Sequence, residues 1–349
     1  MPGEEHPLAS SFRLLHCCPV PDTEADILRL LLAAGSKSVT AATLGRRLGA
    51  PRAVLQTSLK KLLHDGLVVK DAPDAGYRAG PPTAGLHPAL ILAHLRGRLR
   101  PAQLVCLSSV DSTNSEAGRQ LAAGAPVPLV ILARTQTLGR GRRGRAWHSP
   151  AGGNLYVTLV FRPQLAPDRL QDFTLWMGLN VCDLVANFCQ LRPGLKWPND
   201  LLVGGRKAGG MLTEARIEAD HICDLVFGLG LNVNGRTAAL PRELQRTAVS
   251  LAEAAGAPLD LNRFTAALLG RLLSAYAAFI DGGHRDQFAD LWARYDVLRG
   301  QPVTVLQGTR RVTGTVKGID DEGSLIVRPD HGRTERFRAG EVTLGRNAV

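Results

Sequence analysis

The spacing of hydrophobic residues changes twice along this chain, and the change limits what the chain can fold into. Between residues 22 and 80, leucine and isoleucine recur every three or four positions, which predicts short amphipathic helices. From Leu104 to Gly300, apolar runs typical of strands alternate with long helical patterns, and short alternating segments follow. Because 349 residues exceed one ordinary hydrophobic core, two or three domains are expected, and the sequence predicts an α+β multidomain protein.

The segment 22–80 predicts a winged helix-turn-helix domain. Three short helical patterns each end at a glycine, and the first two open at a threonine that can cap a helix. A "LVV" strand, a turn and Tyr77 then predict a β-hairpin wing. On the third helix, polar side chains lie opposite the leucines: Arg52, Gln56, Thr57 and Lys60. This face could enter a DNA major groove, although winged helices also serve as protein-contact modules or spacers.

The remaining boundaries follow from composition. Residues 1–21 predict a flexible tail, and 81–104 a linker with a connecting helix from Pro88 to Leu99. Residues 105–299 predict a mixed sheet with helices on one face, including helical stretches over Leu170–Cys189 and Leu261–Tyr295. Residues 300–349 predict a small antiparallel β-barrel.

Charge and cysteine usage indicate the partners and the compartment. Lys and Arg outnumber Asp and Glu by 42 to 31, and the net charge of +11 favours anionic partners. The six cysteines include no C-x-x-C pair, no signal peptide is recognisable, and no apolar run approaches a membrane span. We therefore expect a protein of the reducing cytoplasm.

The stretch "GRGRRGR", residues 139–145, contains the letters of a dinucleotide-binding loop but lacks its context. Such a loop must open a helix, whereas Pro150, Gly152 and Gly153 follow here, and then another strand-like run. Closely spaced arginines repel one another, so we expect the loop to be disordered until it folds over an anion. Binding of nucleic acid by an arginine-glycine loop is the alternative.

Two further motifs contain candidate ligand-binding residues. In "LKWPND", Lys196 lies in an apolar strand and could place a point charge on a phosphoryl or acyl oxygen. The alternative is a strand lysine that extends to water. In "VDSTN", residues 110–114, a polar turn precedes a helix and by itself predicts an N-cap.

Together these motifs resemble the bacterial biotin protein ligases. "VDSTN", "GRGRRGR", "LKWPND", "RKAGG" and "GLGLN" occur in the family's order, from about residue 22 to 346. With the leading helix-turn-helix and the closing barrel, the chain is similar to the bifunctional class that also represses biotin synthesis genes. The resemblance implies a catalytic domain of the class II synthetase and biotin-lipoate ligase type, and an SH3-like barrel at the C-terminus.

The resemblance also implies the reaction. Biotin and ATP would give biotinyl-5′-adenylate. Mg²⁺ would enter bound to the ATP, and its protein ligands are unknown. The acyl group would then pass to one lysine of the biotin carboxyl carrier protein of acetyl-CoA carboxylase. Arg142 and Lys196 resemble the catalytic cations. Residues resembling the biotin ligands are Ser112, Thr113, Asn114, Gln136, Arg140, Gly141, Arg142 and Lys196, and those on the nucleotide side are Arg140, Arg142, Lys196 and Asn232.

Smaller roles follow in the same way. Gly210, Gly228 and Gly230 are expected to let the backbone approach the ligand, and Asp200 to orient Lys196 or Asn199. A tryptophan that covers adenine in some relatives has no counterpart in "RELQRTAVSL", so Val249 and Leu251 are the expected cover.

The resemblance implies operator DNA as a partner, a homodimer once the adenylate is bound, and no contact with a membrane. A lipoate or octanoate ligase, or a biotin-sensing transcription factor with weak ligase activity, are the alternatives.

Overall fold

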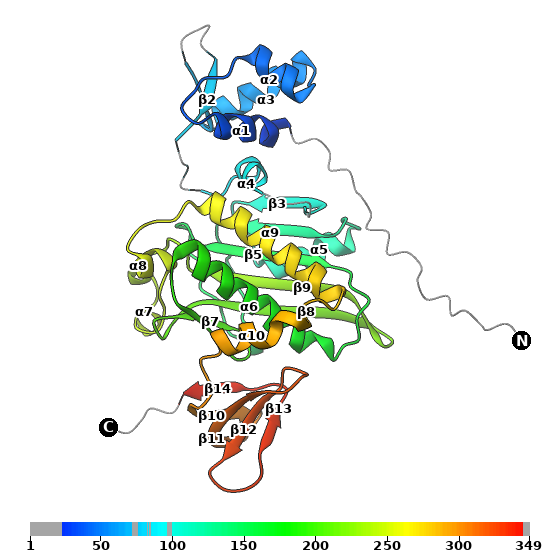
Figure 1. Cartoon of the computed structure of the whole chain (residues 1–349), viewed down its shortest axis with the longest axis vertical. Coiled ribbons are helices and arrows are strands. Elements are labelled where there is room, and N and C mark those ends of the chain that lie inside the picture. The colour runs from blue at the N-terminus through cyan, green and yellow to red at the C-terminus, as the bar shows by residue number, and fades with distance from the viewer. Residues whose placement is uncertain (1–22, 72–75, 82, 84, 96–99, 345–349) are drawn as a thin grey trace, which may run out of the picture.

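Three structural units lie in a row along the longest axis of the molecule (Figure 1). The structure, a computed structural model, describes residues 23–71, 76–81, 83, 85–95 and 100–344. A helical unit with a small hairpin lies at one end, a large sheet covered by helices lies in the middle, and a small all-β unit lies at the other end (Figure 1). The tail predicted over 1–21 lies outside the described residues.

The N-terminal unit has the elements that the leucine spacing predicts. Its helices and strands are α1 (Thr23–Ala34), α2 (Ala41–Leu48), α3 (Arg52–His64), β1 (Val68–Lys70) and β2 (Tyr77–Ala79). Thr40 caps α2, since its side chain accepts a hydrogen bond from the Thr43 amide, and Gly49 ends that helix in the left-handed conformation. Leucines and isoleucines of all three helices form one separate core, beneath the antiparallel β1–β2 pair.

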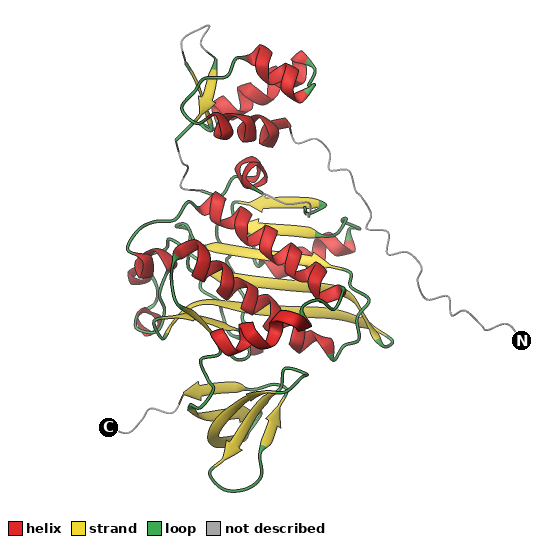
Figure 2. Cartoon of the chain, viewed as in Figure 1, coloured by secondary structure: helices red, strands yellow, loops and turns green. Residues whose placement is uncertain are grey.

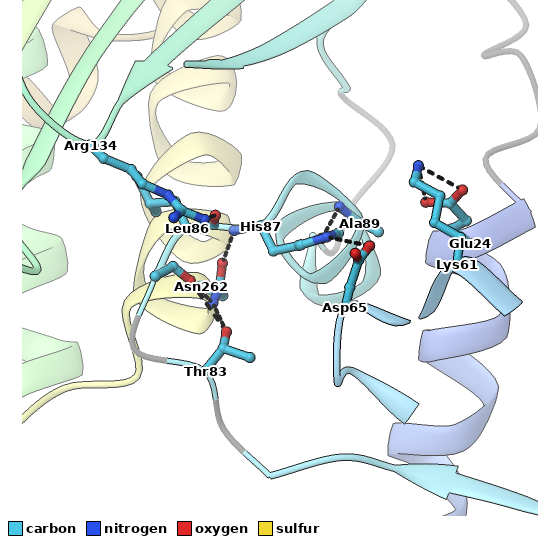
Figure 3. Close-up of polar contacts among 10 residues, drawn as sticks. Glu24, Lys61, Asp65, Thr83, Leu86, His87, Ala89, Arg134 and Asn262 are labelled. Carbon is cyan, nitrogen blue, oxygen red and sulfur yellow. Dashed lines mark hydrogen bonds and ion pairs between the residues drawn. The ribbon is translucent and has the colours of Figure 1, made fainter. Parts of the chain in front are cut away.

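The unit is attached to the middle of the molecule by the segment 83–95, which contains α4 (Pro88–His94) (Figure 3). The Asn262 side chain accepts a hydrogen bond from the His87 amide at 2.8 Å and donates to the Gly85 carbonyl at 2.9 Å. His87 also caps α4 through Nδ1, while its Nε2 lies 3.4 Å from Asp65 at the end of α3. The connecting helix was predicted to reach Leu99, but α4 ends at His94. Residues 96–99 lie outside the described part of the chain.

The middle unit is built on a seven-stranded mixed sheet in the order β3-β4-β5-β9-β8-β7-β6. Its strands are β3 (Gln103–Leu107), β4 (Leu129–Ala133), β5 (Leu155–Phe161), β6 (Pro193–Lys196), β7 (Asp200–Val203), β8 (Arg206–Glu218) and β9 (His221–Leu231). Only the β3–β4 pair is parallel, and the other pairs are antiparallel. The predicted mixed sheet is confirmed.

Helices cover both faces of this sheet, and not one face as predicted (Figure 2). One face packs on α6 (Arg169–Cys189), α9 (Leu261–Ile280) and α10 (Arg285–Tyr295), the last two being one predicted helical stretch interrupted at residues 281–284. On the other face α5 (Thr113–Ala122) packs over Leu129 and Ile131. Between β9 and α9 lie the short helices η2 (Thr237–Ala239), α7 (Arg242–Gln245) and α8 (Leu251–Ala255).

Helix α9 is long and apolar enough, by length and composition, to cross a membrane. It packs against α6 and α4, and half of the apolar window is buried inside the protein. The core of a soluble domain accounts for its composition equally well.

The C-terminal unit is a five-stranded antiparallel sheet in the order β13-β12-β11-β10-β14, which confirms the predicted antiparallel domain. Its strands are β10 (Pro302–Gln307), β11 (Arg310–Ile319), β12 (Leu325–Pro329), β13 (Glu335–Phe337) and β14 (Glu341–Leu344). The buried Trp197 donates a hydrogen bond from Nε1 to the Gly323 carbonyl at 3.0 Å, which joins this unit to the middle sheet.

Candidate functional site

A cavity of about 390 Å³ lies over β8 and β9, on the face of the sheet opposite α6. Both Met211 and Leu212 line it, and the end of the Met211 side chain also packs against Gly178 of α6. The structure brings the predicted ligand residues together here: Ser112, Thr113, Asn114, Gln136, Arg140, Gly141, Arg142, Lys196 and Asn232. Residues far apart in the sequence thus share one site, while their individual roles stay predictions.

At one end of the cavity, Gln136 and the start of α5 form a polar group. The Gln136 Oε1 atom accepts hydrogen bonds from the Thr113 amide at 2.8 Å and from its hydroxyl at 3.1 Å. Ser112 occupies the N-cap position, but its side chain makes no capping hydrogen bond. Gln136, in the loop before "GRGRRGR", therefore caps this helix in place of the Ser112 side chain.

Asn114 is held from several sides. Thr158 donates to Asn114 Oδ1 at 2.7 Å, and Asn114 Nδ2 donates to Glu214 at 2.8 Å. A Cβ on Gly228 would lie 2.2 Å from Asn114 Oδ1. Gly228 therefore makes room for the Asn114 side chain; it also lines the cavity, and its predicted approach to a ligand stays a prediction.

Hydrogen bonds and ion pairs hold the arginine-glycine loop, and its disorder in the absence of a ligand stays a prediction. The Gly141 amide donates to the Arg145 carbonyl at 2.7 Å, and Arg143 adopts a left-handed conformation with φ of 58°. Arg140 pairs with Glu214 at 3.0 Å, and Arg145 pairs with Glu341 of the C-terminal unit. One carboxylate from β8 and one from the C-terminal unit offset the repulsion among the arginines, and the local sequence cannot reveal either pairing.

Arg142 and Lys196 are two half-buried cations that line the cavity. Arg142 donates to Asn199 Oδ1 at 3.3 Å, and burial lowers its pKa, with the neighbouring Arg143 charge acting in the same direction. Burial also lowers the pKa of Lys196, which Asp200 partly counteracts. An anion bound between the two side chains would stabilise their charged forms, which burial disfavours.

We expected Asp200 to orient Lys196 or Asn199, but its carboxylate makes no hydrogen bond to either, although its charge acts on Lys196. It forms an ion pair with Lys207 at 2.7 Å. Asn199 is held instead by Arg142 and by the Met211 carbonyl, to which its Nδ2 donates at 2.7 Å.

The far end of the cavity differs from the sequence-based expectation. Val249 and Leu251 are fully buried in the core and do not line the cavity. The lining side chains from that segment are Leu240, Leu244, Thr247 and Ala248. Asn232 Nδ2 donates to the Val249 carbonyl at 3.3 Å, so the core residue contributes its backbone to the site.

Sequence reasoning missed Trp147 as part of the site. A Cβ on Gly230 would lie 2.4 Å from the Trp147 ring, so this glycine provides space for an indole. The buried Trp147 Nε1 atom has no hydrogen-bond partner among the described residues. An aromatic residue inside an otherwise arginine- and glycine-rich loop was the available signal.

The candidate DNA-reading face is exposed on α3. Arg52, Gln56, Thr57 and Lys60 are all exposed, while Leu55, Leu59 and Leu62 of the same helix are buried. Thr57 Oγ1 donates to the Ala53 carbonyl of its own helix at 3.0 Å, so its hydroxyl is partly used.

Comparisons with known proteins agree with this architecture. Residues 107–232 match the biotin/lipoate A/B protein ligase family, residues 299–345 the biotin protein ligase C-terminal domain, and residues 19–76 the MarR family. The biotin–[acetyl-CoA-carboxylase] ligase of Paracoccus denitrificans is 34% identical, over 68% of this chain and 99% of that protein. The bifunctional ligase/repressor BirA of Escherichia coli K12 is 28% identical, over 93% of this chain and 98% of that protein.

Among solved structures, the chain is similar to the biotin protein ligase from Aquifex aeolicus in complex with biotin and ATP. The TM-score is 0.61 at 28% identity, and the match covers 70% of this chain and 99% of that chain.

Proposed function

This chain belongs to the biotin protein ligase family, and on that premise we propose that it activates biotin with ATP and transfers it to a lysine of a biotin carboxyl carrier protein. The observation that carries the proposal is the cavity itself, which Arg142 and Lys196 line together with the polar group formed by Gln136 and Thr113. The relative from Aquifex aeolicus, solved with biotin and ATP, supports the same pair of substrates.

In the first step, a carboxylate oxygen of biotin attacks the α-phosphorus of ATP and pyrophosphate leaves. Two anions must approach, so positive charge has to offset their repulsion. Arg142 can form paired hydrogen bonds to carboxylate or phosphate oxygens, while Lys196 supplies a compact charge from the strand below. Arg140 and Gly141 lie in the loop segment that would cover the carboxylate and phosphate.

The biotin ring end would occupy the part of the cavity beside α5. Ser112, Thr113, Asn114 and Gln136 offer hydroxyl and amide groups suited to a ureido group. Asn232 would lie on the nucleotide side, beside the Val249 carbonyl.

In the second step, the lysine amine of the carrier attacks the activated carbonyl carbon and AMP leaves. The mixed anhydride must be kept from water until the carrier binds. Loop 139–147 lies over the cavity and is tied to the C-terminal unit through Arg145 and Glu341, so it can shield the intermediate.

Mg²⁺ is expected to bind through the phosphates of ATP. Such a cation usually takes phosphate oxygens and one or two carboxylates. Asp200 is the carboxylate of this cavity that lies beside Lys207 and could join them. In the described part of the chain, no group of three or more His, Cys, Asp or Glu residues could hold a metal.

A labelled-biotin transfer assay with the purified chain and a carrier domain tests the proposal. The wild type should label the carrier, and Arg142→Ala or Lys196→Ala should slow adenylation by at least ~10²-fold. Lipoate and octanoate are offered in parallel, since the matched family includes lipoate ligases. If the chain activated only lipoate or octanoate, biotin would not be its substrate.

A second role is repression of transcription through α3, with operator DNA as the partner. The full-length similarity to bifunctional ligase/repressors and the exposed face Arg52, Gln56, Thr57 and Lys60 favour it. We expect the adenylate-bound chain to form a homodimer in the cytoplasm that aligns two such faces with DNA half-sites. A transcription factor with weak ligase activity remains the competing interpretation, which the transfer assay distinguishes.

A further inference from the structure

The side of α3 that faces away from the core carries two stripes of different chemistry. Residues four positions apart lie on one face of a helix, because one turn takes about 3.6 residues. The first stripe contains Arg52, Gln56 and Lys60, all of which are exposed and polar. Charged and amide side chains of this kind suit phosphates and the polar edges of bases.

The second stripe, which we call the methyl stripe, contains Ala53, Val54 and Thr57. Ala53 and Thr57 are four positions apart and exposed, and the neighbouring Val54 extends the stripe sideways. Val54 is 44% exposed, one of four large hydrophobic residues that are well exposed in the described part of the chain. The core of the N-terminal unit takes Leu55 and Leu59 from α3 and leaves Val54 outside. Packing therefore does not account for a valine at this position.

Thr57 belongs to the methyl stripe because of its own hydrogen bond. Its Oγ1 atom donates to the Ala53 carbonyl, one turn earlier in the same helix, at 3.0 Å. The hydroxyl proton is therefore used within α3, as is common for threonine inside a helix. A hydroxyl in this state is poorly placed to donate to a base, whereas the Cγ2 methyl group of Thr57 remains available for contact.

The methyl stripe lies where a reading helix meets the bases. In helix-turn-helix domains, the N-terminal residues of the reading helix contact base edges in the major groove. All three residues of the stripe belong to the first half of α3. Arg52 begins the same helix, and the exposed Arg46 and Arg47 lie at the end of α2, just before it. This positive charge complements a phosphate backbone, which favours DNA over an apolar protein surface as the partner.

Thymine is the base that offers a methyl group to such a surface. In the major groove its C5 methyl group marks the T·A pair, and alanine and threonine methyl groups are typical contacts for it. We propose that the methyl stripe reads thymine in the operator through the C5 methyl group. The inference rests on the proposed role in repression and names the base that α3 prefers, while the polar stripe supplies phosphate contacts and hydrogen bonds.

Uracil is the matched probe, because it differs from thymine only by that methyl group. Duplexes that bind the full chain with biotin and ATP are first selected from a random library at low salt. Each thymine of the recovered sequence is then replaced by uracil in turn, and fluorescence anisotropy gives Kd at fixed salt. Binding should weaken by about fourfold for each contacted methyl group and should not change at the other thymines.

Two substitutions of Thr57 separate its methyl group from its hydroxyl. Thr57→Val keeps the methyl and removes the hydroxyl, so this variant should retain the preference for thymine over uracil. Thr57→Ser keeps the hydroxyl and removes the methyl, and the uracil effect at the contacted position should fall below about 1.5-fold. Val54→Ala should act in the same way at its own contact. Thermal unfolding of each variant shows whether it is folded.

Lys60→Ala, in the polar stripe, is the matched control. It should weaken binding to the thymine and uracil duplexes by the same factor, since a phosphate contact carries no information about the base. A change in the thymine preference of this variant equal to that of Thr57→Ser would show that the preference does not belong to the methyl stripe.

Three further results would overturn the inference. These are selected half-sites without thymine, uracil replacement without effect at every thymine, and a uracil effect that survives both Thr57→Ser and Val54→Ala. Loss of the preference in Thr57→Val and its retention in Thr57→Ser would make the hydroxyl the reading group. A chain that binds no duplex at low salt would contradict the proposed repression and the inference with it, whereas binding without a thymine preference would contradict the inference alone.

Discussion

Single residues set the shape of the cavity through spaces that only glycine leaves. Gly228 lies against Asn114 and Gly230 against Trp147, so two parts of the cavity depend on two positions of β9 that are two residues apart. The sequence indicated that these glycines matter, since they lie within a buried strand where glycine is costly. It could not say which side chains fill the space, because Asn114 and Trp147 come from other segments.

We expect Gly228→Ala to weaken biotin binding more than it weakens the fold. The new methyl group would overlap Asn114 and should cost about 1–3 kcal/mol while shifting the amide from its partners. Biotin affinity and the free energy of unfolding are measured together. Gly118→Ala, on α5 with open space around it, is the control, and alanine there should stabilise the helix slightly. Unchanged biotin affinity in Gly228→Ala would show that Asn114 is not a ligand.

The pH dependence of adenylation should reflect Lys196. Burial lowers its pKa, so its charge is present at low pH and is lost as pH rises through a value below that of an ordinary lysine. We expect kcat/KM to decline on the alkaline side, and kcat to decline at higher pH because the bound anion raises the pKa again. Single-turnover rates across the alkaline range test this. In Lys196→Arg the decline should vanish, even if the maximal rate is lower, since arginine stays charged.

At the scale of elements, the spacing of hydrophobic residues predicted the strands and long helices. It did not predict which elements contact one another. Leu170–Cys189 was predicted and Arg169–Cys189 is observed, because an uninterrupted apolar pattern marks a core helix. A β-bulge at Ala208 carries no local signal, since it depends on how β7 and β8 align. The pairing of Arg145 with Glu341 was equally invisible, because the partners lie in different domains.

The junction between the DNA-reading unit and the sheet should depend on Asn262. Replacing it with alanine removes the partners of the partly buried Gly85 carbonyl and His87 amide, at a cost of about 1 kcal/mol for each group. We expect Asn262→Ala to speed proteolytic cleavage between the two units and to widen the molecule in small-angle scattering. Ligase activity should change little. Asn187→Ala, an exposed asparagine bonded only within α6, should behave as wild type; equal behaviour of both variants would contradict the role of Asn262.

At the scale of the whole molecule, α3 lies in the unit at one end and the cavity lies in the middle, so any communication between them passes through the 83–95 segment (Figure 1). Arg134, at the start of the loop that holds Gln136, donates to the Leu86 carbonyl at 3.2 Å (Figure 3). The ligand site and the DNA-reading unit are therefore joined by short polar contacts. The sequence predicted both units, but it gave no sign of this connection.

We expect biotin and ATP together to strengthen DNA binding, because both units share that junction and a dimer would align two reading faces. Fluorescence anisotropy at fixed salt measures the effect. By linkage, DNA should raise the affinity for the adenylate by the same factor. Lys60→Ala should weaken binding to all sequences, and Lys317→Ala on β11 should not. Absence of DNA affinity at low salt would reduce the N-terminal unit to a spacer.

The junction at Asn262 also limits how the N-terminal domain can be lost or exchanged. Its side-chain amide bonds to Thr83, Gly85 and His87, so helix α9 of the middle unit contributes to the attachment of the domain before it. A descendant that discarded its first eighty or so residues, or an engineer who exchanged them, would still have to retain the short segment from Thr83 onward. The boundary at which the N-terminal domain can be removed therefore lies before Thr83.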